Sequence, residues 1–292
     1  MKKTISLLTL FLTVVFASYG QEEDDQDDQK SNIQEYTPSK LLNKGQWDIK
    51  WFNNLYTQTK GANSSGNVSK NLPRETYFTS SFDIFTGVSN NSKLNVGLLF
   101  EVRSNAINDK GALDVFSFKG EKGVARSGLT SFAPAIKFSP FKNLNNFTIQ
   151  TAFHIPIIKN ESENGVFLDQ TAYTFQNRFF YDYNFPNGDW QLFAELNTEY
   201  SFGEEESFAN KTFALTPGVF MSYFPSRKST ILGFVQHQQR VGDLKQDYTA
   251  LGFGGKYQLT SVLNLEVLYS NFIRGSSTGL GQSFNIGLRA LF

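Results

Sequence analysis

The chain ends in a segment whose apolar and polar side chains alternate, QSFNIGLRALF at residues 282–292. Successive side chains of a strand point to opposite faces, so Phe284, Ile286 and Leu288 share one face with Phe292, and the polar residues between them share the other. Segments with this period recur throughout the chain after Trp47, and the period predicts strands, not helices. The twelve predicted strands are 47–57, 77–88, 93–103, 129–138, 147–157, 171–183, 190–202, 212–223, 231–239, 248–257, 263–272 and 282–292.

The start of the chain has the organisation of a secretory leader. Lys2 and Lys3 precede an apolar run over residues 5–16, and small residues end the segment before Gln21. The apolar run is shorter than the roughly 20 residues that a membrane-spanning helix needs. We therefore expect residues 1–20 to be a signal peptide and the mature chain to be exported.

Composition separates an N-terminal tail from the rest of the mature chain. Residues 21–45 begin with an acidic run, EEDDQDDQ at 22–29, which is typical of a solvated segment. We expect an acidic periplasmic tail over 21–45, or alternatively an arm that enters the following domain or holds cations. Residues 46–292 are expected to form a single β domain.

Charge and cysteine content exclude several classes of function. The chain has 27 basic and 27 acidic residues, and loss of Lys2 and Lys3 with the leader leaves a small acidic excess. This balance argues against nucleic-acid binding. The chain contains no cysteine, so it has neither disulfides nor thiolate metal sites.

The predicted connections alternate between short turns and long polar loops. Transmembrane β-barrels have short periplasmic turns and longer extracellular loops, and a sheet in lipid must close so that every backbone group is paired. The pattern predicts an all-β fold, a closed antiparallel transmembrane barrel of twelve strands with both termini in the periplasm. A soluble β-sandwich is the alternative. The predicted long loops are 59–76, 104–128, 159–170, 203–211, 240–247 and 274–280.

Four features together carry a resemblance to a known class of protein: the leader before Gln21, the alternating strands, the segment NFIRG at 271–275, and the terminal strand. The mature chain resembles small outer-membrane β-barrel proteins of Bacteroidota, of the transporter or porin-like kind. The resemblance implies an outer-membrane location, contact with outer-membrane lipid and assembly by the barrel-assembly machinery, with Phe292 as the terminal assembly signal. It implies no particular activity, because such barrels have unrelated functions.

Strand parity assigns one face of each strand to lipid and the other to the lumen. The predicted lumen face carries charges of both signs. These charges are either paired with one another, as buried charges must be, or they form a constriction that sorts solutes by charge. The candidate lumen-lining residues are Asp83, Glu101, Arg103, Lys137, Arg178, Glu195, Glu199, Lys256, Glu266 and Arg289.

The mixed signs favour small hydrophilic solutes that are neutral or zwitterionic. About eight strands leave an interior filled by side chains, whereas sixteen to eighteen leave an aqueous channel, so a twelve-stranded barrel predicts a narrow pore or transporter. Loop 104–128 is long enough to fold inward. A closed lumen would instead indicate a plugged structural or partner-binding barrel of an outer-membrane complex.

An outer-membrane lipase is the enzymatic alternative, and it would need a nucleophile beside a base. His154 and His237 are the only histidines, and neither lies in the His-x-Ser-Asn-Gly-Arg pattern of outer-membrane phospholipase A. Two separated histidines are also too few for a zinc site. We expect no enzyme, no catalytic residue, no cofactor and no metal.

Overall fold

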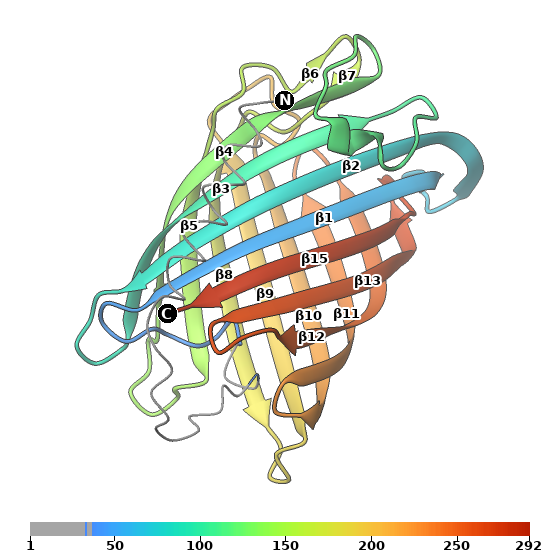
Figure 1. The fold of residues 1–292 in the computed structure, drawn as a ribbon. Coiled ribbons are helices and arrows are strands. Elements are labelled where there is room, and N and C mark those ends of the chain that lie inside the picture. Colours follow the sequence, from blue (N-terminus) through green and yellow to red (C-terminus); the bar gives the residue numbers. More distant parts are fainter. Residues whose placement is uncertain (1–32, 34–36) are drawn as a thin grey trace. The chain divides into compact units, whose positions relative to one another are not determined.

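A computed structural model of the chain describes Ile33 and residues 37–292. The predicted signal peptide and the acidic run at 22–29 lie outside the described residues. The described part contains no helix that is long and apolar enough to cross a bilayer. Its main element is a closed sheet of twelve long antiparallel strands, which confirms the predicted fold class (Figure 1).

All twelve predicted strands are present. They are β1 (Trp47–Ala62), β2 (Val68–Gly87), β3 (Leu94–Ala106), β4 (Ala125–Phe138), β5 (Phe147–Pro156), β8 (Tyr173–Asn184), β9 (Trp190–Phe202), β10 (Thr212–Ser226), β11 (Ser229–Val241), β12 (Gln246–Gln258), β13 (Leu263–Ser276) and β15 (Gln282–Leu291). Three two-residue strands and a short 3-10 helix belong to the connections: β6 (Ser162–Glu163), β7 (Val166–Phe167), β14 (Thr278–Gly279) and η2 (Asp114–Ser117).

The first and last strands close the sheet. β1 pairs with β2 along one edge and with β15 along the other, so that Trp51 lies opposite both Phe82 and Leu288. Trp47 and Phe292 exchange two backbone hydrogen bonds, of 2.7 and 3.0 Å. The terminal residue therefore takes part in closure, and the barrel keeps no free edge that would have to lie in lipid.

The strands extend further than predicted at the end where the long loops lie. The prediction of a loop over 59–76 is wrong for most of its length, because β1 and β2 continue as a paired hairpin from Lys60 and Lys70 to Ala62 and Val68. Lys60, Lys70 and Arg74 interrupt the apolar residues of this extension, so it lacks the regular apolar alternation by which the spanning parts of the strands were recognised.

The outward faces of the strands are apolar, as the alternation predicts. Leu98 is 45% exposed and Phe253 is 63% exposed. In β11, Ile231 and Val235 are exposed on the outer wall whereas Phe234 lines the interior. An exposed apolar band on a closed barrel fits a lipid environment.

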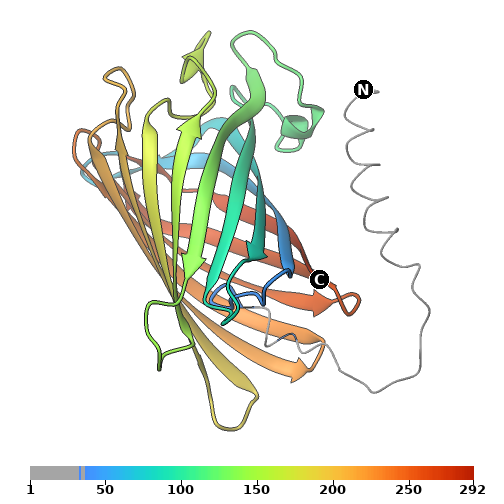
Figure 2. The same ribbon diagram turned by 90° about the vertical axis from the view of Figure 1, so that its left-hand side faces the viewer.

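The loop after β3 packs against the outer wall, outside the lumen (Figure 2). Val115 of η2 is buried against Phe78, whose outward ring also contacts Phe116 and Phe118, with ring centres 5.0 and 5.9 Å away. The Ser104 hydroxyl donates a 2.7 Å hydrogen bond to the Val115 carbonyl. The hypothesis that loop 104–128 folds inward to plug the lumen is therefore wrong. Its apolar residues cover an outward ring that would otherwise be exposed.

The substitution Leu98→Arg should impair folding into a bilayer, because it places a charge on the outer face. We expect a cost of about 2–4 kcal/mol near the bilayer midplane. Thr79→Arg, on the interior face of the neighbouring strand β2, is the matched control and should cost less. Folding into liposomes, measured by urea titration, checks this. Equal costs for the two variants would contradict the assigned facing.

Candidate pore lumen

The interior of the barrel contains a cavity of about 1020 Å³. Inward side chains from every long strand except β4 and β5 line it. The interior beside those two strands is filled, because Leu42 packs there with Phe85 and Leu99 and with small residues of β4 and β5, including Ala133 and Ala152. The open part of the lumen is therefore displaced toward the other strands.

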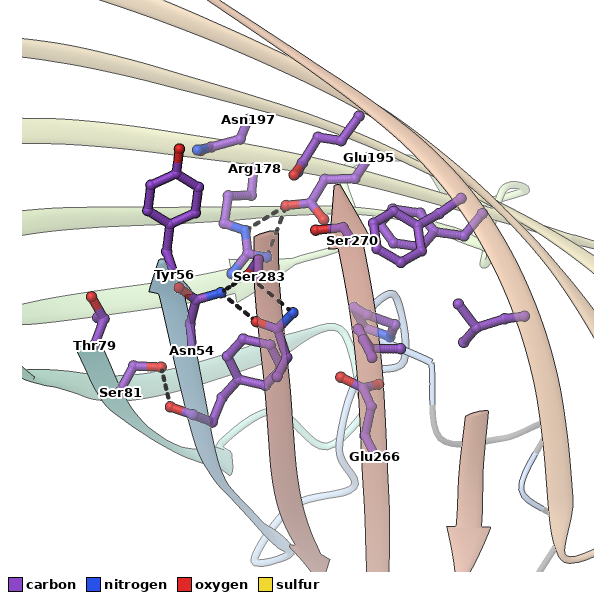
Figure 3. Close-up of a pocket in the computed structure, with 18 of the residues that line it drawn as sticks. Asn54, Tyr56, Thr79, Ser81, Arg178, Glu195, Asn197, Glu266, Ser270 and Ser283 are labelled. Atoms are coloured by element: carbon purple, nitrogen blue, oxygen red, sulfur yellow. Dashed lines mark hydrogen bonds and ion pairs between the residues drawn. The ribbon is translucent and has the colours of Figure 1, made fainter. Parts of the chain in front are cut away.

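Ion pairs link neighbouring strands across the cavity wall. Arg178 of β8 and Glu195 of β9 form an ion pair, drawn in Figure 3, and their charged atoms are 2.8 Å apart. Lys256 of β12 lies opposite Glu266 of β13, and their charged atoms are 2.9 Å apart. Such pairs satisfy charges that would otherwise be costly to place inside the barrel.

The structure brings most of the predicted lumen residues to the cavity. Lys137 is instead buried, with its ammonium 5.6 Å from the centre of the Phe180 ring. Arg289 forms an ion pair with Asp48 at 2.7 Å. The seven that line the cavity are Asp83, Glu101, Arg178, Glu195, Glu199, Lys256 and Glu266.

Amides and hydroxyls gather on the side of the cavity formed by β1, β2 and β15, beside the charged side chains of Lys50 and Asp83. The Asn54 amide donates hydrogen bonds to Ser283 and Asn285, as Figure 3 shows. Thr79 and Ser81 of β2 line the same region. These amides and hydroxyls both donate and accept hydrogen bonds, so this wall suits solutes that do the same.

Phenylalanines form a row on the opposite side of the cavity, among polar residues of β9 to β11, and the sequence reasoning missed this row. Phe220 of β10 lies directly opposite Phe193 and Phe234 on the adjacent strands, with ring centres 5.5 and 5.1 Å away. The next strand provides space for this wall, because a side chain at Gly252 would come within 2.2 Å of the Phe234 ring. The available signal was a break in alternation: Phe193 and its neighbours Leu192 and Ala194 are all apolar.

A different loop from the one predicted reaches the cavity at the end of the barrel where the long loops lie. It connects β5 to β8, contains the β6–β7 hairpin, and brings Phe167 to the cavity. The Asn105 amide donates to the carbonyls of Phe167 and Leu168 at 2.8 and 3.1 Å. Arg103 and Asp169 form an ion pair at 3.0 Å. Burial raises the pKa of the Asp169 carboxyl, and the Arg103 guanidinium opposes that shift.

Part of the predicted N-terminal tail bounds the cavity at the end of the barrel where the short turns lie. Leu42 is 2% exposed, and its backbone N–H donates to the Asn95 side chain at 3.1 Å. Thr37 and Pro38 line the cavity, and the Ile33 backbone donates to the turn between β10 and β11. Residues 37–42 therefore pack inside the barrel end, where Thr37, Ser39 and Leu42 are buried. We call residues 37–46 the N-terminal strap.

The two histidines do not form a catalytic group within the described residues. His154 contacts the Gln176 side chain at 3.3 Å, and His237 contacts the Thr249 hydroxyl at 3.0 Å. Nor does this part of the chain contain a cluster of three or more His, Asp or Glu residues that could hold a metal ion.

Comparisons with known proteins identify the fold. No family model matches the chain, and no curated protein matches it in sequence. The structure is similar to an outer membrane channel from Pseudomonas putida F1, with a TM-score of 0.68 and 9% identity over 92% of this chain and 100% of that one. The chain has the fold of an outer-membrane β-barrel.

A second similar structure is the β domain of the Bordetella autotransporter BrkA, with a TM-score of 0.55 and 12% identity over 84% of this chain and 99% of that one. A channel and an autotransporter domain thus share this barrel. At such low identity the likeness concerns the fold, and the activity has to be argued from the interior of this barrel.

Asn105→Ala should release the loop between β5 and β8 without unfolding the barrel, because it removes two hydrogen bonds to that loop. Hydrogen exchange should become faster over residues 157–172 while β8 to β13 stay protected. Asn108→Ala is the control, since Asn108 is an exposed loop residue that bonds to the Gly123 carbonyl instead. Equal exchange in both variants would contradict the anchoring role of Asn105.

Proposed function

We propose that this protein is an outer-membrane channel for small hydrophilic solutes. The observation that carries the proposal is a polar, partly charged cavity of about 1020 Å³ inside a closed barrel. Water and polar solutes can occupy such a lumen, whereas a barrel with only a structural role has no need of one. In this proposal both termini lie in the periplasm, and Phe292 is part of the signal read by the barrel-assembly machinery.

The charges of the lumen support permeation of neutral or zwitterionic solutes. Arg178 and Lys256 are each within 3 Å of a carboxylate, so neither is available as an isolated attractor for anions. Acidic residues outnumber basic ones along the cavity, because Glu101 and Glu199 add to the paired carboxylates. The expected selectivity is therefore a mild preference for cations, not strong sorting by charge.

The ends of the cavity limit the size of the solute. Phe167 and Phe208 contact each other on the extracellular side, with ring centres 5.4 Å apart, and both line the cavity. The N-terminal strap bounds the periplasmic side through Leu42 and Thr37. A narrow pore follows from this arrangement. The alternative to a narrow pore is a barrel whose lumen is closed and which has a structural or partner-binding role.

Single-channel recording in planar bilayers tests the proposal. Wild-type protein should give small conductance steps, and Leu42→Asp should give larger ones, because a carboxylate cannot stay buried against Phe85 and Leu99 and the strap should leave its site. Leu144→Asp, in the exposed turn before β5, is the control and should behave as wild type. Absence of conductance from both wild type and Leu42→Asp would refute the channel and favour the plugged barrel.

Glu195→Gln should shift the selectivity of the pore toward anions, because it removes the carboxylate that neutralises Arg178. The reversal potential in a potassium chloride gradient measures this shift. Glu205→Gln, in the exposed loop between β9 and β10, removes the same charge outside the lumen and should leave the reversal potential unchanged. Identical reversal potentials for all three proteins would show that the Arg178–Glu195 pair does not line the conduction path.

A further inference from the structure

We propose that the lumen holds a binding site for neutral saccharides between its aromatic and polar walls. The proposal deepens the channel function, on which it rests for the route by which the sugar reaches the site. It depends on three features of the cavity: the two walls face each other, Arg178 and Lys256 are each paired with a carboxylate, and the space is large enough.

The two walls lie on opposite sides of the barrel. In the order of the twelve strands, β9 and β10 are half a circumference away from β1 and β2. Phe193 and Phe220 project from the first pair, and Asn54 and Ser81 project from the second. A solute in the cavity therefore meets rings on one side and hydrogen-bonding groups on the other.

The aromatic wall lies on three adjacent strands, β9 to β11. Phe180 of β8 is buried and does not line the cavity, but its ring centre is 6.0 Å from that of Phe193, so it supports the row. Phe220 and Phe234 continue it, and their rings are nearly parallel, with an interplanar angle of 21°. The Arg178 guanidinium lies 5.1 Å from the Phe180 ring centre, which joins the row to the ion pair with Glu195. The rings are thereby held in place before any solute enters.

The chemistry of the two walls together matches a sugar ring. One face of a pyranose carries mainly C–H groups, which contact the electron-rich face of an aromatic ring favourably. Its rim carries hydroxyls that each donate and accept hydrogen bonds. The network of Asn54, Ser283 and Asn285 is built from groups with the same dual capacity.

Other solute classes fit this cavity less well. A purely apolar compound would cover the polar wall and leave its amides and hydroxyls unpaired, which is costly. An anionic solute would lose hydration with little positive charge to replace it, because Arg178 and Lys256 are paired with carboxylates and Lys50 lies opposite Asp83 on the neighbouring strand. The cavity, about 1020 Å³, is at the upper end of the size of ordinary small-ligand sites, so a disaccharide fits within it.

Isothermal titration calorimetry with maltose, on the full chain in detergent micelles, tests the site directly. Wild-type protein should bind maltose, and Phe220→Ala and Phe234→Ala should each bind at least about tenfold more weakly. Phe220→Leu keeps an apolar side chain of similar size without the ring, so it should also weaken binding if the ring face is what matters. Phe253→Ala removes a ring of the same kind from the outer wall and should bind as wild type does.

Two further probes distinguish the solute class. Benzyl alcohol offers a ring with a single hydroxyl, and gluconate offers several hydroxyls with a charge. Both should bind at least about tenfold more weakly than maltose. Binding of benzyl alcohol as tight as that of maltose, or maltose binding that is absent or insensitive to Phe220→Leu, would overturn the saccharide site.

Calorimetry tests the saccharide site and conductance tests the channel, so the outcome of one measurement does not determine the outcome of the other. Conductance without maltose binding would leave the channel standing and remove the saccharide site. Maltose binding without conductance would keep the site in a closed barrel and remove the channel. Thermal unfolding of each variant is compared with that of wild type. This control shows whether a variant that does not bind maltose is still folded.

Discussion

Pairing of the backbone around a complete circle is the constraint on which the rest of this structure depends. In lipid, an unpaired strand edge would leave N–H and C=O groups without partners, so the sheet has to close. β1 meets β15 and β2, and the two hydrogen bonds between Trp47 and Phe292 extend pairing to the last residue. Closure then places every second side chain inside the barrel, where polar and charged groups need hydrogen-bond or ion-pair partners.

The interior satisfies that requirement in three different ways. Beside β4 and β5 it is filled by a small apolar core around Leu42. Around β1, β2 and β15 it is lined by amides and hydroxyls that bond to one another. Around β9 to β11 it is lined by phenylalanines whose rings contact one another. Ion pairs such as Arg178–Glu195 and Lys256–Glu266 lie on the strands between these regions, and the lumen is consequently asymmetric.

The two longest loops lie on different sides of the barrel wall, one outside and one inside the lumen. The loop after β3 covers the outward ring of Phe78, whereas the loop before β8 is drawn inward by Asn105 and Arg103. The N-terminal strap enters from the other end because Leu42 finds apolar partners there. The size of the opening at each end is thus a property of segments outside the barrel strands.

The sequence by itself determined the fold, because the side-chain period of a strand is two and lipid requires closure. Alternation located all twelve strands, and parity identified Glu195, Glu266 and the other carboxylates that line the cavity. Only the tertiary structure decided which loop turns inward, where the strap packs, and that phenylalanines form one wall. Those features depend on contacts between residues far apart in the chain, such as Asn105 with Phe167 or Leu42 with Asn95, and local periodicity carries no information about such contacts.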